Sequence, residues 1–224
     1  MTIKALVFDF DGLILETETP IYQSYCDLYR RYECEMSREQ WMKNIGTADV
    51  HFDPIADLER TIGRQIDREK DLPWRLEREL ELIAVQPVMS GVIEYLQAGR
   101  RLGLKQAIAS SSSCKWVQGH LERLKLSDYF DAVVSSDDVR RTKPDPELYR
   151  TACEWLEVQP PEAVAFEDSL HGLLAAKAAG LHCVVVPTEL TAGLAMEDAD
   201  LRLDSLAEQP LETVLSRLNG RAAG

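Results

Sequence analysis

Short apolar runs alternate with longer amphipathic segments along most of this 224-residue chain. The sequence opens on one such run, and four more follow Val88. The five runs are Ile3 to Phe8, Lys105 to Ser110, Ala132 to Ser135, Ala163 to Phe166 and His182 to Val186. Apolar runs separated by helical patterns are typical of parallel strands joined by crossover helices. The sequence therefore predicts an α/β fold built on a parallel sheet.

Two of the intervening segments carry apolar residues at the spacing of a helix that buries one face. Their positions are Tyr149, Ala152, Cys153 and Leu156, and later Leu211, Val214, Leu215 and Leu218. Asp145 and Pro146 predict the start of the first helix, because Asp is a good N-cap and proline suits the first helical position. Asn219 and Gly220 predict the end of the second.

Residues 16–87 show helical spacing and no convincing strand. The positions concerned are Ile21, Tyr25, Leu28 and Tyr32, then Ile55, Leu58, Ile62 and Ile66, then Leu76, Leu80 and Ile83. We therefore expect a helical cap domain at 16–87, inserted into an α/β core domain formed by 1–15 and 88–224. The two crossings would provide a hinge for a lid; a plain second subdomain is the alternative.

The charge of the chain argues against polyanionic partners. Lys and Arg total 25 against 38 Asp and Glu, a net charge of −13, which would repel nucleic acid and anionic lipid. A soluble acidic surface is the simplest reading, and a locally positive pocket could still hold a phosphate. The sequence shows no leader peptide and no apolar run approaching 18 residues, so a cytoplasmic monomer is the default expectation. The five cysteines lack metal or disulfide spacing.

Polar side chains follow the ends of the apolar runs, where the ligand of an open parallel sheet binds. Asp9 and Asp11 come directly after the first run, and Gly12 lets the backbone turn behind them. The other positions are Ser110 with Ser111, Lys143 within Thr142–Pro146, and Glu167 and Asp168 before Ser169. These acids, hydroxyls and one lysine are therefore expected on one rim of the sheet.

Each of these groups suits phosphoryl transfer, in which positioning and charge neutralisation supply most of the catalysis. Asp9 could attack phosphorus and form an aspartyl-phosphate, while Asp11 could protonate the leaving oxygen and later activate water. Asp168, together with Glu167, would help Asp9 to hold Mg²⁺, which prefers carboxylate oxygens. The serines after the second run and Lys143 would bind the phosphate oxygens.

Simpler interpretations remain open for each motif alone. The serine run could be a helix cap, and Lys143 could be a solvated residue at a helix start. Glu167 and Asp168 could only place negative charge at the next helix N-terminus. His171 is expected in the first turn of that helix and not as a metal ligand. The functional interpretation rests on all the motifs falling at the ends of successive strands.

Together, these motifs resemble those of the haloacid dehalogenase-like superfamily, in its phosphatase and β-phosphoglucomutase-like branch with a helical cap. The resemblance covers essentially the whole chain. The four motifs are Asp9–Gly12, Ala109–Ser110, Lys143–Pro144, and Glu167–Ser169 followed by Gly172, Ala175, Ala176, Ala179 and Gly180. The resemblance implies a Rossmann-like parallel sheet core with helices on both faces.

The resemblance also implies a role for each motif residue. Asp9 would be the nucleophile and Asp11 the acid/base. Mg²⁺ would lie among Asp9, the main-chain carbonyl of Asp11, Glu167 and Asp168. An aspartate at position 11 favours phosphate esters over haloacids, because dehalogenases of the superfamily lack that proton carrier.

Three departures separate the branches of the superfamily. Glu16 stands where relatives commonly have an aspartate, and Ile21 stands at the position that matches a histidine of the sugar-phosphate mutases. Three residues past Gly46, where the mutases have an arginine, this chain has Asp49. A carboxylate there would repel a second phosphate, which favours hydrolysis.

The leading hypothesis is therefore a Mg²⁺-dependent phosphatase that acts on a small phosphorylated metabolite such as a sugar phosphate. A phosphomutase of the β-phosphoglucomutase type is the alternative, and a binding protein that has lost catalysis is a third possibility. Candidates to contact the leaving group, or simply to lie at the surface, are Lys43, Asn44, Thr47 and His51.

Overall fold

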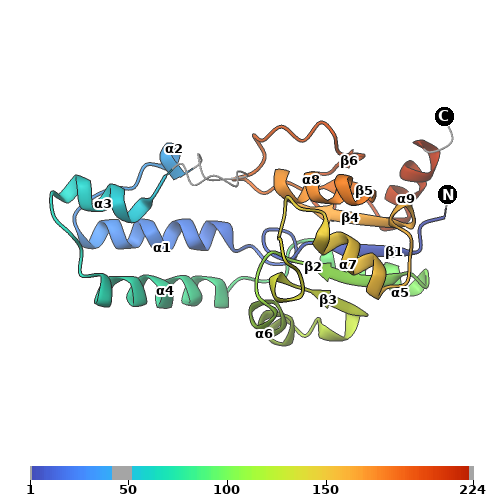
Figure 1. The fold of residues 1–224 in the computed structure, drawn as a ribbon, viewed down its shortest axis with the longest axis horizontal. Helices are drawn as coiled ribbons and strands as arrows, with labels where there is room; N and C mark the ends of the chain where they lie inside the picture. Colours follow the sequence, from blue (N-terminus) through green and yellow to red (C-terminus); the bar gives the residue numbers. More distant parts are fainter. Residues whose placement is uncertain (1, 42–51, 222–224) are drawn as a thin grey trace. The chain divides into compact units, whose positions relative to one another are not determined.

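The computed structural model describes residues 2–41 and 52–221, which fall into two compact units. The first unit is formed by Met1–Leu15 with Val88–Gly224, and the second by Glu16–Pro87. Each unit has its own buried hydrophobic core. The first contains the whole parallel sheet, whereas the second is helical where it is described (Figure 1).

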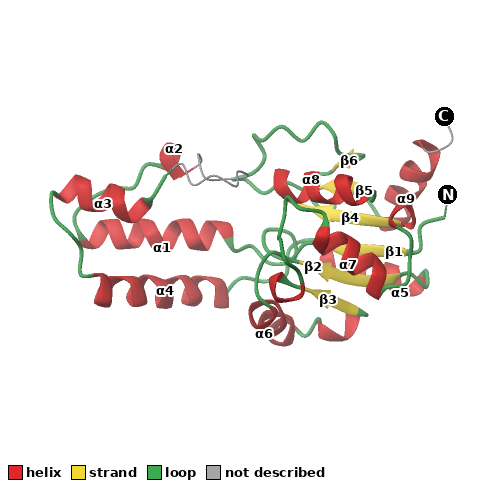
Figure 2. Cartoon of the chain, in the orientation of Figure 1, coloured by secondary structure: helices red, strands yellow, loops and turns green. Residues whose placement is uncertain are grey.

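The first unit is built on a six-stranded sheet in which every pair of neighbouring strands is parallel (Figure 2). The strand order is β3-β2-β1-β4-β5-β6. The strands are β1 (Ala5–Phe8), β2 (Lys105–Ala109), β3 (Ala132–Val134), β4 (Ala163–Glu167), β5 (His182–Val185) and β6 (Leu201–Arg202). Because β1 lies between β2 and β4, its carboxyl end falls where the chain changes direction across the sheet.

Helices of the first unit cover both faces of this sheet. They are α5 (Val92–Arg101), α6 (Cys114–Leu124), α7 (Glu147–Trp155), α8 (Leu170–Ala179) and α9 (Leu211–Arg221), with the 3-10 turns η2 (Ser127–Tyr129), η3 (Ser136–Asp138) and η4 (Pro160–Glu162). On one face, α7 packs against β2 and β3 and α8 against β5; on the other, α5 packs against α9 and β2. Of the described helices, none is both long enough and apolar enough to cross a membrane.

The side chains of β1 alternate between these two faces. Val7 belongs to the core cluster that includes residues of α7 and α8. Phe8 points to the opposite face and stacks on Phe166 with ring centroids 5.0 Å apart, and Tyr95 of α5 packs edge-on against Phe166. Since successive strand residues point to opposite faces, Asp9 is directed to the α7 side.

The second unit contains α1 (Glu18–Arg31), α2 (Arg38–Trp41), α3 (Pro54–Ile62) and α4 (Arg68–Ala84). Its core includes Leu28 and Leu58, both fully buried. The helix predicted to reach Ile66 ends at Ile62, because Gly63 adopts a left-handed conformation (φ 69°) that terminates it. Gly46, Asp49 and the proposed contact residues Lys43, Asn44, Thr47 and His51 lie outside the described residues.

The α/β fold class predicted from the sequence is confirmed, and all five predicted strands are present. The two-residue β6 was missed because it is too short to show a periodic pattern. Helix α7 begins at Glu147 and not at Pro146, which is its N-cap; Asp145 instead accepts a hydrogen bond from the Glu147 amide through Oδ1. Helix α9 continues through Gly220 to Arg221.

Candidate active site

The predicted site residues that follow β1, β2 and β4 lie at the carboxyl edge of the sheet. Asp9 follows β1 directly, and its amide donates to the Phe166 carbonyl of β4 at 3.0 Å. Ser110 follows β2, and its amide donates to the Val134 carbonyl at 3.0 Å. Glu167 is the last residue of β4. Backbone pairing therefore continues one residue past β1 and β2 and fixes where these side chains start.

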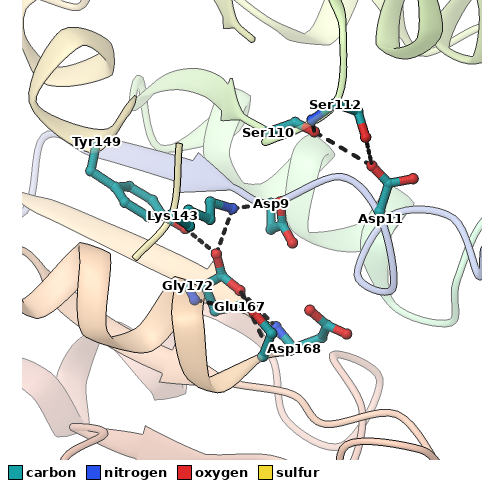
Figure 3. Close-up of polar contacts among 10 residues, drawn as sticks. Asp9, Asp11, Ser110, Ser112, Lys143, Tyr149, Glu167, Asp168 and Gly172 are labelled. Atoms are coloured by element: carbon teal, nitrogen blue, oxygen red, sulfur yellow. Dashed lines mark hydrogen bonds and ion pairs between the residues drawn. The ribbon is translucent and has the colours of Figure 1, made fainter. Parts of the chain in front are cut away.

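Lys143 joins Asp9 to Glu167 (Figure 3). Its Nζ lies 2.6 Å from Asp9 Oδ1 and 2.6 Å from Glu167 Oε1, and its side chain is only 5 % exposed. Burial alone would lower the pKa of this ammonium, but attraction to the two carboxylates outweighs burial and raises the pKa above its ordinary value. Lys143 is therefore a fixed positive charge at neutral pH.

Glu167 is fully buried and accepts hydrogen bonds at both carboxylate oxygens. Lys143 and the Tyr149 hydroxyl of α7 donate to Oε1. The amides of Asp168 and Ser169 and the Ser169 hydroxyl donate to Oε2. A carboxylate offers about four lone-pair sites, so these five hydrogen bonds from the protein itself fill the acceptor capacity of Glu167.

Two glycines make room for this arrangement. A Cβ atom at Gly172, in the first turn of α8, would lie well under 3.0 Å from the Glu167 carboxylate. Gly12 adopts φ +83°, a conformation that suits glycine, and a Cβ atom there would overlap the Asp168 carboxylate. Both backbones therefore approach the acidic side chains as closely as they do because no side chain intervenes.

Asp9, Glu167 and Asp168 form a buried acidic cluster in which one carboxylate oxygen from each lies within 4.8 Å of the others. Burial, with repulsion from Glu167, raises the pKa of Asp9 to about 7 even though Lys143 opposes the shift. With the Asp11 carboxylate nearby, the charge of Lys143 does not balance the acids. Hard oxygen ligands with excess negative charge are what Mg²⁺ requires, so the residues present fit this metal.

Asp11 is held by the segment that follows β2. The Ser112 hydroxyl donates to Asp11 Oδ2 at 2.7 Å, the Ser110 hydroxyl lies 3.4 Å from the same oxygen, and Trp116 Nε1 donates to Oδ1 at 3.0 Å. Figure 3 shows the Asp11 carboxylate turned toward the two serines. The Ser111 side chain, which the sequence suggested as a phosphate ligand, is exposed.

Some of the simpler interpretations of the polar motifs also describe real contacts, but a solvated Lys143 is not one of them, because its side chain is buried. Ser113 is the N-cap of α6 and accepts from the Trp116 amide, and Ser169 is the N-cap of α8 and accepts from the Gly172 amide. His171 lies in the first turn of α8, as expected. The same short segments thus start helices and present polar groups at the edge of the sheet.

Sequence reasoning missed Tyr149, Ser112 and Trp116. Tyr149 was recognised only as a buried helical position, and its side chain is indeed fully buried. Its proximity to Lys143, six residues earlier, was the available signal. Ser112 belongs to the serine run but was not distinguished from its neighbours, and nothing in the local sequence marks the indole of Trp116 as a partner of a carboxylate 105 residues away.

Comparison with known proteins shows similarity over nearly the whole chain. Residues 6–186 match the family described as haloacid dehalogenase-like hydrolase. The YhcW protein of Bacillus subtilis (strain 168) is 44 % identical over 219 residues, covering 98 % of this chain and 99 % of the relative. A phosphorylated carbohydrates phosphatase of Thermotoga maritima is 30 % identical over 181 residues, covering 80 % and 82 %.

A solved structure has a similar fold. CbbY from Rhodobacter sphaeroides, in complex with phosphate, superposes with a TM-score of 0.68 at 29 % identity, covering 92 % of this chain and 96 % of that one. A mutant of the same protein was solved with xylulose-(1,5)bisphosphate and gives a TM-score of 0.67.

Proposed function

The chain belongs to the haloacid dehalogenase-like hydrolase family, and from this premise we propose that it is a Mg²⁺-dependent phosphatase that hydrolyses a small phosphorylated metabolite. The observation that carries the proposal is the buried contact of Lys143 with both Asp9 and Glu167 beside Asp168. This contact joins residues of three of the predicted motifs at one edge of the sheet.

Asp9 is the proposed nucleophile. Lys143 contacts its Oδ1 atom, which fixes the orientation of the carboxylate. Attack on phosphorus would form a covalent aspartyl-phosphate and split one difficult displacement into two easier steps. Asp9 attacks as the anion, so the same positive charge that orients it also opposes its protonation.

Asp11 is the proposed acid/base. It would give a proton to the leaving oxygen in the first step and take one from water in the second, a role usually worth ~10²–10⁴-fold in rate. Ser110 and Lys143 would donate to the phosphate oxygens; Ser111 is retained as a proposed phosphate ligand through its exposed position beside Ser110.

Asp9, Asp168 and the main-chain carbonyl of Asp11 would hold Mg²⁺, which would offset the negative charge of the phosphate and the carboxylates. Glu167 completes the proposed set, but its five hydrogen bonds favour a supporting role in which it positions Lys143 and the Asp168 backbone. Such supporting partners commonly tune metal affinity.

Sugar phosphates are the proposed substrate class, because the similar T. maritima protein is named as a phosphatase of phosphorylated carbohydrates. We rank hydrolysis ahead of mutase activity because two residues depart from the pattern of the mutases. Ile21, which lies in α1, stands in place of their histidine, and Asp49 stands in place of their arginine. Residues 16–87 are proposed as the cap domain of the family, and the protein is taken as a monomer.

The test is release of inorganic phosphate from a panel of sugar, polyol and nucleotide monophosphates with Mg²⁺ present. We expect turnover of at least one sugar or polyol phosphate, and none by Asp9→Asn. Turnover by Asp9→Asn would rule out the nucleophile. Isomerisation of a hexose 1-phosphate that depends on a bisphosphate primer would instead establish the mutase.

A further inference from the structure

Trp116 can act only as a donor toward the Asp11 carboxylate, because an indole N–H donates a hydrogen bond but cannot accept one. Its Nε1 atom lies 3.0 Å from Asp11 Oδ1. In a protonated carboxyl group the carbonyl oxygen is a better acceptor than the hydroxyl oxygen, so this contact is stronger when Oδ1 carries no proton. The contact with Trp116 therefore favours Oδ2 as the oxygen that carries the proton of a protonated Asp11.

The partners of Oδ2 are chemically different. The Ser112 hydroxyl lies 2.7 Å from Oδ2 and the Ser110 hydroxyl 3.4 Å from it. A serine hydroxyl can rotate and act as donor or acceptor, so both serines tolerate Oδ2 with or without a proton. Ser110 is also a proposed phosphate ligand, which places Oδ2 on the side of Asp11 where the ester would bind.

The ring of Trp116 is fixed by neighbours from the same site. It packs edge-on against His120 with ring centroids 4.5 Å apart, and His120 in turn stacks on Phe10 at 6.2 Å. Phe10 is fully buried and lies between the two aspartates in the chain. The indole is thus connected by packing to the loop that carries Asp9 and Asp11.

We propose that Trp116 is a positioning residue for Asp11, holding Oδ1 as an acceptor so that proton exchange with the substrate passes through Oδ2. This inference rests on the proposed function, because it takes Asp11 as the acid/base. In the first step the bond from phosphorus to the ester oxygen breaks and one to Asp9 forms. The Oδ2 proton moves to the ester oxygen and releases a neutral alcohol, leaving Asp11 as the anion.

The test compares two esters that differ in their need for an acid. Phenyl phosphate releases a strongly basic phenolate that benefits from protonation, whereas 4-nitrophenyl phosphate releases a weakly basic one that does not. The ratio kcat/KM reports only on the first half-reaction and so excludes hydrolysis of the aspartyl-phosphate. Trp116→Phe keeps an aromatic ring and removes the N–H.

We expect Trp116→Phe to lower kcat/KM about tenfold for phenyl phosphate, a part of the full acid contribution, and less than about twofold for 4-nitrophenyl phosphate. Trp155→Phe is the matched control, because Trp155 at the end of α7 is 50 % exposed; both rates should be unchanged. Trp116→His restores a ring N–H and should recover part of the loss. Melting temperatures report whether each variant is folded.

The Asp11→Asn variant separates the positioning role of Trp116 from the acid/base role of Asp11 on which it depends. If Trp116 acts through Asp11, adding Trp116→Phe to Asp11→Asn should cause no further selective loss. Equal losses on both esters, or losses that add in the double variant, would overturn the positioning role and leave the phosphatase standing. Normal hydrolysis of phenyl phosphate by Asp11→Asn would refute the acid/base role and the inference together.

Discussion

Alanine substitution at two helical glycines should have opposite effects on stability. Gly172 in α8 and Gly119 in α6 are both helical, and Gly→Ala in a helix ordinarily stabilises by up to about 1 kcal/mol. A Cβ atom at Gly119 would meet nothing within 4 Å, whereas one at Gly172 would overlap the Glu167 carboxylate. We therefore expect Gly119→Ala to stabilise the protein and Gly172→Ala to destabilise it.

The size of the effect at Gly172 follows from the partners of Glu167. A flexible side chain would move aside at little cost, but Glu167 is fully buried and held by Lys143, Tyr149 and the backbone after β4. Overpacking costs about 1–3 kcal/mol, and disturbing one hydrogen bond to a charged group about 1.5–3 kcal/mol. After a helix gain of up to about 1 kcal/mol is subtracted, Gly172→Ala should lose about 1.5–5 kcal/mol.

Urea unfolding followed by circular dichroism measures both variants against the wild type, and the phosphatase assay accompanies it. Gly172→Ala should also lower kcat/KM, because a displaced Glu167 no longer positions Lys143 against Asp9. The reasoning is refuted if Gly172→Ala is as stable as the wild type, or if Gly119→Ala is destabilised by a similar amount. Unchanged m-values would show that the comparison concerns the folded state.

Two further substitutions test the charges of the acidic cluster. The pKa of Asp9 is raised from 3.8 to about 7, so protonation of Asp9 stabilises the folded protein. This contribution to the free energy of unfolding is fully present below about pH 4 and is lost as pH rises through 7. In EDTA, Asp9→Asn should therefore melt above the wild type at pH 8 and lose that advantage at pH 4; a constant difference would contradict the shift. Lys143→Met leaves Asp9 and Glu167 without their shared ammonium and should cost about 3–5 kcal/mol at pH 8, measured by urea unfolding; a loss below about 1 kcal/mol would show that the ion pairs matter little.

The sequence was sufficient to predict those parts of the site that depend on residues close together in the chain. Asp9, Asp11 and Gly12 are closely spaced features of one strand end, and an apolar strand followed by a glycine is recognisable from a few residues. Lys143 and Glu167 were predicted as site residues in the same way, because each comes after an apolar run. The rim of a parallel sheet then brings together positions as far apart as Asp9 and Asp168.

The supporting contacts could not be found in this way, because each depends on side-chain direction across the fold. Tyr149 fits an apolar helical stripe, and only packing of α7 against the sheet brings its hydroxyl to Glu167. Ser112 and Ser111 are identical in type and adjacent, yet Ser112 is the one of the two that contacts Asp11. Gly172 was recognised as part of a motif, but the sequence does not show why a glycine is needed there. The structure does, because the Glu167 carboxylate occupies the space that a Cβ atom would need.

The net charge of −13 argues against polyanionic partners, but the excess of carboxylates in this site is compatible with binding a small phosphate ester. An acidic protein that binds a phosphate ester must concentrate positive charge where the ester sits, and Lys143 is already engaged by Asp9 and Glu167. A divalent cation among the carboxylates would change the sign of the local field without adding a basic residue. Because such coupling is reciprocal, phosphate would in turn tighten the metal. With such a cation bound, the acidic cluster would favour the binding of an anion instead of opposing it.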